Sequence, residues 1–179
     1  MRYITGATCV TCFSGDTFIL GKGLMHVPEI IFGKRRDAVS NGQSVRESSN
    51  ERYDTDKPLL HEIVKDKKIK EVSFALWANG AELIDGYGNA GYICPKCMRI
   101  HEKFFYTLRS PEGEYQPSYR CSSCSIKLLR ITEKESMLWH DNEEGKSEIE
   151  CEGGVVLKWK CRKCGGETLA LLGGVGFWD

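Results

Sequence analysis

Apolar residues occur in short runs near the two ends of the chain and through its second half. These runs lie at residues 18–20, 104–108, 126–131, 149–151, 155–159 and 170–172. Each run is only three to six residues long and is bounded by glycine or polar residues, which favours short strands over helices. Gly153 and Gly154 separate two of the runs, which predicts a hairpin of 149–151 with 155–159.

Residues 27–86 have the spacing of helices instead. Pro28 followed by Glu29 is typical of a helix start. That helix would carry Ile30, Ile31 and Val39 inward. Asp56 can cap a second helix that begins near Pro58, with Leu59, Leu60, Ile63 and Val64 on one stripe. The polar, Ser-rich residues 41–51 between them predict a loop.

Residues 69–79 fit two patterns. Ile69, Val72 and Leu76 have helical spacing and would end at Gly80. Val72, Phe74 and Leu76 alternate as a strand would, with Asn79 and Gly80 as a hairpin turn. We favour the helix.

Eight of the nine cysteines form four Cys-x-x-Cys pairs, at 9/12, 94/97, 121/124 and 161/164. Two such pairs facing each other supply four thiolates, the usual ligand set of a structural zinc ion. The chain therefore predicts two zinc ions. A rubredoxin-like iron site is the chemical alternative, because four thiolates also suit iron.

Four pairs can combine in three ways, and we favour a nested scheme. Cys94 and Cys97 would join Cys121 and Cys124, while Cys9 and Cys12 would join Cys161 and Cys164. The segments after the outer pairs support this scheme, because each has a Leu-Gly step eight residues after the second cysteine. The long outer loop costs little, since closure entropy grows only by about 0.6 kcal/mol per doubling of length. Sequential pairing is the alternative.

The nested scheme predicts an α+β fold: two small antiparallel zinc ribbons with a helical insertion. Residues 1–26 with 149–179 would form an outer ribbon from the two termini. Residues 27–86 would be the helical insertion, 87–132 the inner ribbon and 133–148 a charged connector.

Charge and composition narrow the range of partners. Lys plus Arg equals Asp plus Glu at 25 each, and each zinc bound by four thiolates adds a charge of −2, which takes the formal charge from 0 to −4. Nucleic-acid binders usually show a basic surplus, so this balance weighs against one. No apolar run is long enough to span a membrane and the first residues lack a signal-peptide pattern, so we expect a cytoplasmic protein with reduced thiols.

The cysteine segments 94–97, 121–124 and 161–166 resemble the rubredoxin-type knuckles of zinc-ribbon proteins. The order of parts also resembles a group of small, functionally uncharacterised bacterial proteins. In that group a first knuckle leads into a Leu-Gly-x-Gly step, here Leu20-Gly21-Lys22-Gly23, and helices and further knuckles follow. The resemblance implies the metal sites and no mechanism.

Other candidate residues have plainer interpretations. Cys151 is flanked by Glu150 and Glu152, which would raise its pKa, so we expect a buried apolar residue rather than a nucleophile. His101 could replace a cysteine as ligand, but the cysteine sets are complete. The aromatic residues of the inner ribbon are Tyr87, Tyr92, Phe104, Phe105, Tyr106 and Tyr119. They could stack on single-stranded nucleic acid, although core packing is the better interpretation.

Three functions remain open. The favoured hypothesis is a non-enzymatic zinc protein whose two ribbons form a scaffold for another macromolecule, more readily a protein than a nucleic acid. The second is a nucleic-acid-binding ribbon that uses the inner-ribbon aromatics and basic residues. The third is an enzyme with a cleft between the helices and the ribbon.

Overall fold

The structure is a computed structural model that describes residues 2–22, 27–33, 58–132 and 148–177. Its elements are β1 (Arg2–Cys9), β2 (Gly15–Gly21), α1 (Pro28–Phe32), α2 (Leu60–Ile63), α3 (Lys67–Ala78), β3 (Glu82–Ile93), β4 (Ile100–Ser110), β5 (Gly113–Tyr115), β6 (Leu129–Arg130), β7 (Glu148–Cys151), β8 (Val155–Lys158) and β9 (Leu169–Phe177). A 3₁₀ turn, Glu152–Gly154, joins β7 to β8.

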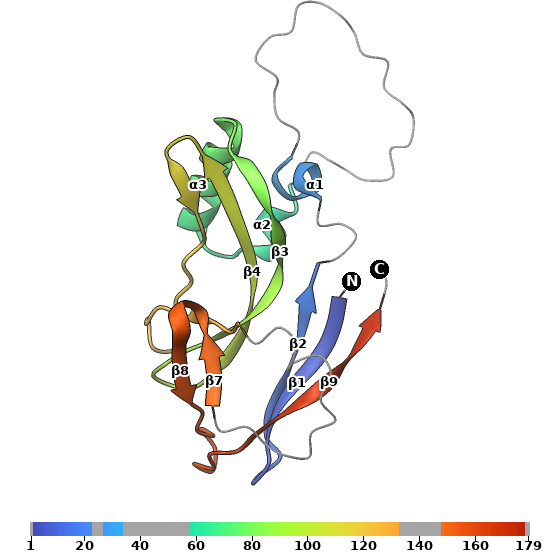
Figure 1. The fold of residues 1–179 in the computed structure, drawn as a ribbon, viewed down its shortest axis with the longest axis vertical. Helices are drawn as coiled ribbons and strands as arrows, with labels where there is room; N and C mark the ends of the chain where they lie inside the picture. The colour runs from blue at the N-terminus through green and yellow to red at the C-terminus, as the bar shows by residue number, and fades with distance from the viewer. Residues whose placement is uncertain (1, 23–26, 34–57, 133–147, 178–179) are drawn as a thin grey trace, which may run out of the picture. The chain divides into compact units, whose positions relative to one another are not determined.

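Antiparallel strands dominate the described part of the chain, so the α+β prediction is wrong. One sheet has the strand order β5-β4-β3-β2-β1-β9, with β6 also paired to β3, and β7 pairs with β8 separately (Figure 1). The expected helical insertion is present only weakly, because α1 and α2 have five and four residues. The strands are longer than the sequence pattern predicted. Strand β3 has 12 residues, but buried and exposed positions do not alternate along it, so periodicity could not reveal its length.

Three local predictions are confirmed. Residues 67–78 form the helix α3, whose N-terminus is capped where the side chain of Asp66 accepts a hydrogen bond from the Ile69 amide at 3.1 Å. A short helix, α1, begins at Pro28 and buries Ile31. The hairpin of β7 and β8 turns at Gly153 and Gly154. The predictions for the Ser-rich loop, Val39, Asp56 and residues 133–147 lie outside the described residues.

The chain divides into two compact units. Unit 1 comprises residues 1–24, 86–106 and 117–179, and unit 2 comprises 25–85 and 107–116. All nine cysteines belong to unit 1. Its core packs Ala7, Ile93, Ile100, Ile131, Ile149, Trp159 and Leu169 around the buried sulfurs of Cys9, Cys151 and Cys161.

Strand β1 is the centre of the terminal part of unit 1. It pairs with β2 from Arg2↔Gly21 to Thr8↔Gly15, and on its other side with β9 from Arg2↔Phe177 to Cys9↔Leu169. The pairing with β9 shifts register between Ile4 and Gly6. The first and last strands of the described chain, β1 and β9, are therefore direct neighbours, and β2 lies on the other side of β1, which brings cysteines far apart in sequence to one end of the sheet (Figure 1).

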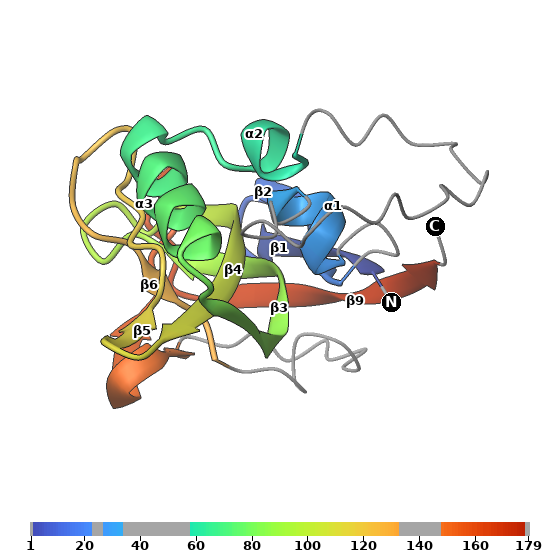
Figure 2. The same cartoon turned by 90° about the horizontal axis from the view of Figure 1, so that it is seen from above.

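Unit 2 has a small core of its own. The ring of Trp77 in α3 stacks on Phe32 of α1 with centroids 5.0 Å apart, and its Nε1 donates to the Gly33 carbonyl at 3.1 Å. Leu60, Val64 and Ile69 are also buried. Figure 2 shows α3 lying beside the hairpin of β4 and β5.

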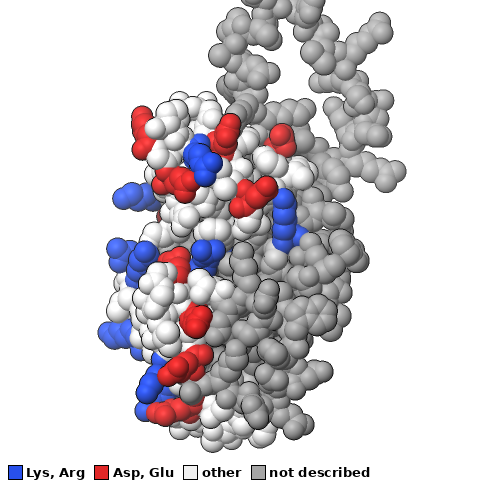
Figure 3. Space-filling view, in the orientation of Figure 1, with Lys and Arg blue, Asp and Glu red and all other residues white. Residues whose placement is uncertain are grey.

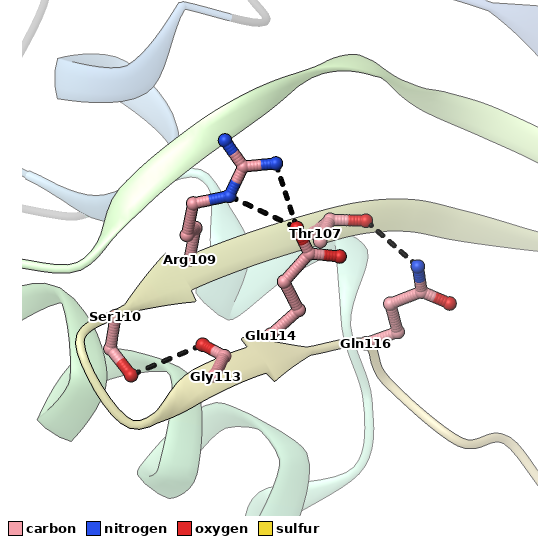
Figure 4. A network of polar contacts seen from close by, with 6 residues as sticks. All are labelled: Thr107, Arg109, Ser110, Gly113, Glu114 and Gln116. Atoms are coloured by element: carbon pink, nitrogen blue, oxygen red, sulfur yellow. Dashed lines mark hydrogen bonds and ion pairs between the residues drawn. The ribbon is translucent and has the colours of Figure 1, made fainter.

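Polar contacts hold the end of the β4–β5 hairpin together (Figure 4). Arg109 donates from Nε and Nη2 to one carboxylate oxygen of Glu114, at 3.0 and 2.7 Å. The amide of Gln116 donates to the Thr107 hydroxyl at 3.1 Å, and the Ser110 hydroxyl donates to the Gly113 carbonyl at 3.2 Å. Thr107 is buried, whereas the Arg109–Glu114 and Ser110–Gly113 contacts are exposed, so these two contacts fix the register of the hairpin more than they add stability.

Candidate metal centres

Each Cys-x-x-Cys pair lies in a turn with the same backbone pattern, which we call a knuckle: the six residues that begin at its first cysteine. In every knuckle the amide of the first cysteine donates to the carbonyl of the sixth residue. These bonds are Cys9 to Ser14, Cys94 to Arg99, Cys121 to Ile126 and Cys161 to Gly166, at 2.8–3.0 Å. The amide of the fifth residue donates back to the first cysteine's carbonyl, at 2.8–2.9 Å in all four. Two reciprocal bonds hold both sulfurs on one side of each turn.

The fifth residue of each knuckle is left-handed. Its φ is 55° at Phe13, 54° at Met98 and 57° at Ser125, and 76° at Gly165. Only glycine adopts this conformation without strain, so the first three knuckles each hold a residue at a cost of about 1–2 kcal/mol. All four knuckles close with the same hydrogen bonds, and the first three carry strain that the fourth does not.

The eight paired cysteines gather in two groups of four. Cys9, Cys12, Cys161 and Cys164 form the outer quartet, and Cys94, Cys97, Cys121 and Cys124 form the inner quartet. Within each quartet all sulfurs lie within 4.8 Å of one another. The knuckles are thus combined in the nested arrangement, first with fourth and second with third.

The spacing of the sulfurs fits a tetrahedral metal ion. Sγ···Sγ distances are 3.6 Å for Cys9–Cys164, 3.7 Å for Cys12–Cys161 and 3.8 Å for Cys97–Cys121. A tetrahedron with metal–sulfur bonds of about 2.3 Å has edges of about 3.8 Å. All nine cysteines are free thiols. Both quartets can therefore hold a divalent ion, and a four-thiolate set suits zinc or iron.

Close backbone contact joins the two knuckles of the outer quartet. The Val10 amide donates to the Thr168 carbonyl at 3.1 Å. A Cβ added to Gly166 would lie 2.5 Å from the hydroxyl oxygen of Thr11 and 3.0 Å from its Cβ. Glycine is needed at this position because the first knuckle lies directly against it. The hydroxyl of Ser14 contacts the sulfurs of both knuckles, at 2.9 Å from Cys12 and 3.5 Å from Cys161.

These contacts favour ionised thiols in the outer quartet. The hydrogen bond with the Ser14 hydroxyl, joined by backbone amides of Cys164 and Lys163, lowers the pKa of Cys161 to about 6. The same hydroxyl lowers the pKa of Cys12. The amide of Gly166 favours the thiolate of Cys164, but burial and the sulfurs of Cys12 and Cys9 outweigh it and raise that pKa to about 12. Four thiolates in one place need a cation.

In the inner quartet, too, some thiols have a lowered pKa and others a raised one. Burial opposes ionisation of Cys121, but the backbone amides of Ser123 and Cys124 and the side chain of His101 outweigh it and lower the pKa to about 6. The neighbouring sulfur of Cys97, together with burial, raises the pKa of Cys124 to about 12. Burial raises the pKa of Cys94. Cys121, the first cysteine of the third knuckle, is thus the thiol of the inner quartet that ionises most readily.

Sequence analysis missed two residues of the site and assigned a third differently. Ser14 and Thr11 lie in the first knuckle, where a hydroxyl one or two residues from a cysteine is too common to single out. His101 was considered as a replacement ligand. It lies outside both quartets, and its side chain helps to lower the pKa of Cys121. A histidine four residues after a Cys-x-x-Cys pair is the pattern that could have indicated this effect.

The remaining candidates lie apart from the quartets. Cys151 is buried on β7 in the unit 1 core, as expected from its sequence context. The rings of Tyr87, Tyr92, Phe104, Tyr106 and Tyr119 are all buried, so they form core rather than an exposed stacking platform. Phe105 is half-buried, and the guanidinium of Arg130 lies 3.8 Å from its ring centroid.

None of the helices in the described residues is long and apolar enough to cross a lipid bilayer. Comparison of the chain with protein-family models, with curated proteins and with solved structures finds no match.

Proposed function

We propose that the protein binds two zinc ions as structural centres and that the zinc-bound body is a scaffold for contact with another protein. The observation that supports this most is the chemistry of the quartets. Each supplies four thiols at tetrahedral spacing, which would complete the coordination of zinc and leave no position for a water or a substrate. Such a site stabilises a fold and does not catalyse.

Metal analysis tests the structural part. The reduced protein should contain two zinc ions per chain by elemental mass spectrometry, and exhaustive chelation should unfold unit 1. Iron in place of zinc, or unchanged folding after chelation, would contradict the proposal.

Two variants sharpen this test. Cys161→Ser should lose one zinc ion and destabilise the outer quartet, because a thiolate ligand is removed. Cys151→Ala is the matched control, since Cys151 is a buried cysteine of the same unit that belongs to neither quartet. It should keep both ions. Loss of zinc from the control would show that the ligand set is wrong.

Charge and exposure support a protein partner. On the face shown in Figure 3, basic and acidic side chains of the described residues are interspersed, without a continuous basic stripe. The first knuckle exposes two apolar side chains: Phe13 is 81% exposed and Val10 is 39% exposed. A strained, exposed aromatic residue on a rigid turn is suited to insert into an apolar pocket of another protein.

Binding experiments separate the two kinds of partner. Chemical crosslinking in the cells that make the protein should capture a protein partner, and Phe13→Ser should abolish that crosslink. Ile126→Ser, which removes another exposed apolar side chain from the third knuckle, should not. Salt-sensitive retention on single-stranded DNA or RNA at low ionic strength would favour a nucleic-acid partner instead.

A further inference from the structure

A cavity of about 380 Å³ lies within unit 1, where the first, second and fourth knuckles meet. Its lining includes three cationic residues and a group of apolar ones. The cationic residues are Arg99, Arg162 and Lys163, and the apolar ones include Ile100, Trp159 and Leu169. None of the described residues that line the cavity carries a carboxylate, and Cys161 of the outer quartet also lines it. The cavity thus combines positive charge with an apolar wall.

The three cations come from two different knuckles. Arg99 is the last residue of the second knuckle, and Arg162 and Lys163 lie between the two cysteines of the fourth. In the described part of the chain none of them forms an ion pair with a carboxylate. Arg99 donates a hydrogen bond to the neutral Ser123 hydroxyl at 3.2 Å. Their charges are available to a ligand.

Compensation of the metal–thiolate charge does not account for this arrangement. Lys96 and Lys160 also lie within three residues of a quartet cysteine, and neither lines the cavity. Charge compensation acts through space and needs no cavity. Three cations that line one open cavity together with the buried Trp159 are typical of ligand sites, which combine an apolar wall with a few polar groups.

We propose that this cavity binds a phosphate monoester that carries an aromatic or similarly flat apolar group. Guanidinium groups bind phosphate oxygens in a bidentate manner, and a dianion matches several cations better than a carboxylate does. The volume falls within the range of small-molecule sites, roughly 300–1,000 Å³, and suits a ligand of mononucleotide size or smaller. Trp159 and Leu169 would contact the apolar group.

The test uses phenyl phosphate as the probe, with the zinc-loaded full chain. Titration followed by ¹H–¹⁵N correlation spectra should show saturable one-to-one binding, with the Trp159 indole and the amides of Ile100 and Leu169 among the shifted signals. Inorganic phosphate and phenol each carry one half of the probe and should bind at least about tenfold more weakly, because each loses one set of contacts.

Variants make the test specific. Arg99→Gln and Arg162→Gln should each weaken phenyl phosphate binding about tenfold, the loss expected for one charge-assisted hydrogen bond. Lys96→Gln removes the same charge from the second knuckle, but from a residue that does not line the cavity, so this variant should bind the probe as the unchanged protein does. Zinc content is measured in every sample, so failure to bind with two zinc ions retained contradicts this inference and leaves the structural role of zinc intact. Absence of saturation at 10 mM probe, roughly the limit of weak specific binding, or equal weakening in Lys96→Gln, overturns it.

Discussion

The fifth residue of each knuckle decides how much strain the turn carries. Gly165 has a left-handed backbone at no steric cost, whereas Phe13, Met98 and Ser125 adopt the same conformation with a side chain present. The four turns nevertheless share their hydrogen bonds. The reciprocal backbone bonds and the packing around the sulfurs must therefore outweigh the strain in the first three.

Substitutions at the fifth residue of the first and of the fourth knuckle should change the free energy of unfolding in opposite directions. Phe13→Gly should raise the free energy of unfolding by about 1 kcal/mol, because it relieves the strained φ and removes a side chain that is largely exposed. Gly165→Ala should lower it by about the same amount, since the nearest atom to the new Cβ is Lys160 Cε at 3.7 Å and only the backbone is strained. Denaturant unfolding of the zinc-loaded proteins measures both. A destabilising Phe13→Gly would show that the ring makes contacts that stabilise the fold.

Glycine at position 166 is needed because there is no room for a side chain beside Thr11, not because of backbone strain. Gly166→Ala would place a methyl group against Thr11 and push the first and fourth knuckles apart, which should weaken zinc binding at the outer quartet. The inner quartet should keep its affinity. Competition with a chromophoric chelator measures the two sites separately.

A second substitution distinguishes crowding from a general loss of stability. Thr11→Gly removes both Thr11 atoms that the new methyl group would meet, so the double variant should recover most of the outer-site affinity. If the double variant binds zinc no better than Gly166→Ala alone, the contact between the knuckles is not what makes glycine necessary.

At the scale of elements, sequence patterns predicted those parts whose signal is local. The helix at residues 67–78 has apolar residues at helical spacing, and the β7–β8 hairpin has a Gly-Gly turn between two apolar runs. Strand β3 has neither signal over Glu82–Asn89, where Gly86 and Gly88 interrupt the apolar residues. Its hydrogen bonds come from pairing with β4 and β2. The sequence of one segment alone cannot indicate that pairing.

The cap of α3 gives a prediction at this scale. Asp66→Ala should destabilise unit 2 by about 1 kcal/mol, because the Ile69 amide loses its acceptor at the helix start. Asp66→Asn should preserve most of that stability, since its carbonyl oxygen can accept the same bond. The near-ultraviolet circular dichroism of Trp77, compared with a Trp77→Phe reference, reports the unfolding of this unit. Equal losses in both Asp66 variants would indicate that charge, rather than the cap, is responsible.

At the scale of the whole molecule, the cysteine spacing indicated the architecture of unit 1 more fully than its strand pattern did. Four thiol pairs allow few combinations, and likeness between the outer segments favoured the nested one. The fold class was wrong because spacing identifies which turns meet, but it carries no information on how far the strands beside them extend. The contacts of Ser14, Thr11 and His101 with the quartets depend on that three-dimensional arrangement.

The two units should respond differently to metal removal. Unit 2 contains no cysteine in its described residues and has its own buried core around Trp77, so it should keep amide protection in α3 after chelation. Unit 1 should lose protection in β1, β2 and β9. Hydrogen exchange with mass spectrometry, at matched pH and temperature, resolves these segments. Simultaneous loss of protection in α3 would show that the two units unfold together.

Cys9 and Cys164 lie 155 positions apart along the chain. A ribosome that adds about 5–20 residues per second needs on the order of 8–30 seconds to cover that interval. During that interval Cys9 and Cys12 are already made, but Cys161 and Cys164, the other two members of the outer quartet, are not. Strand β1 also still lacks its neighbour β9. Slow elongation combined with a burst of oxidant would therefore cross-link these sulfurs wrongly before the last strand arrives, whereas oxidant given after completion would find them already enclosed.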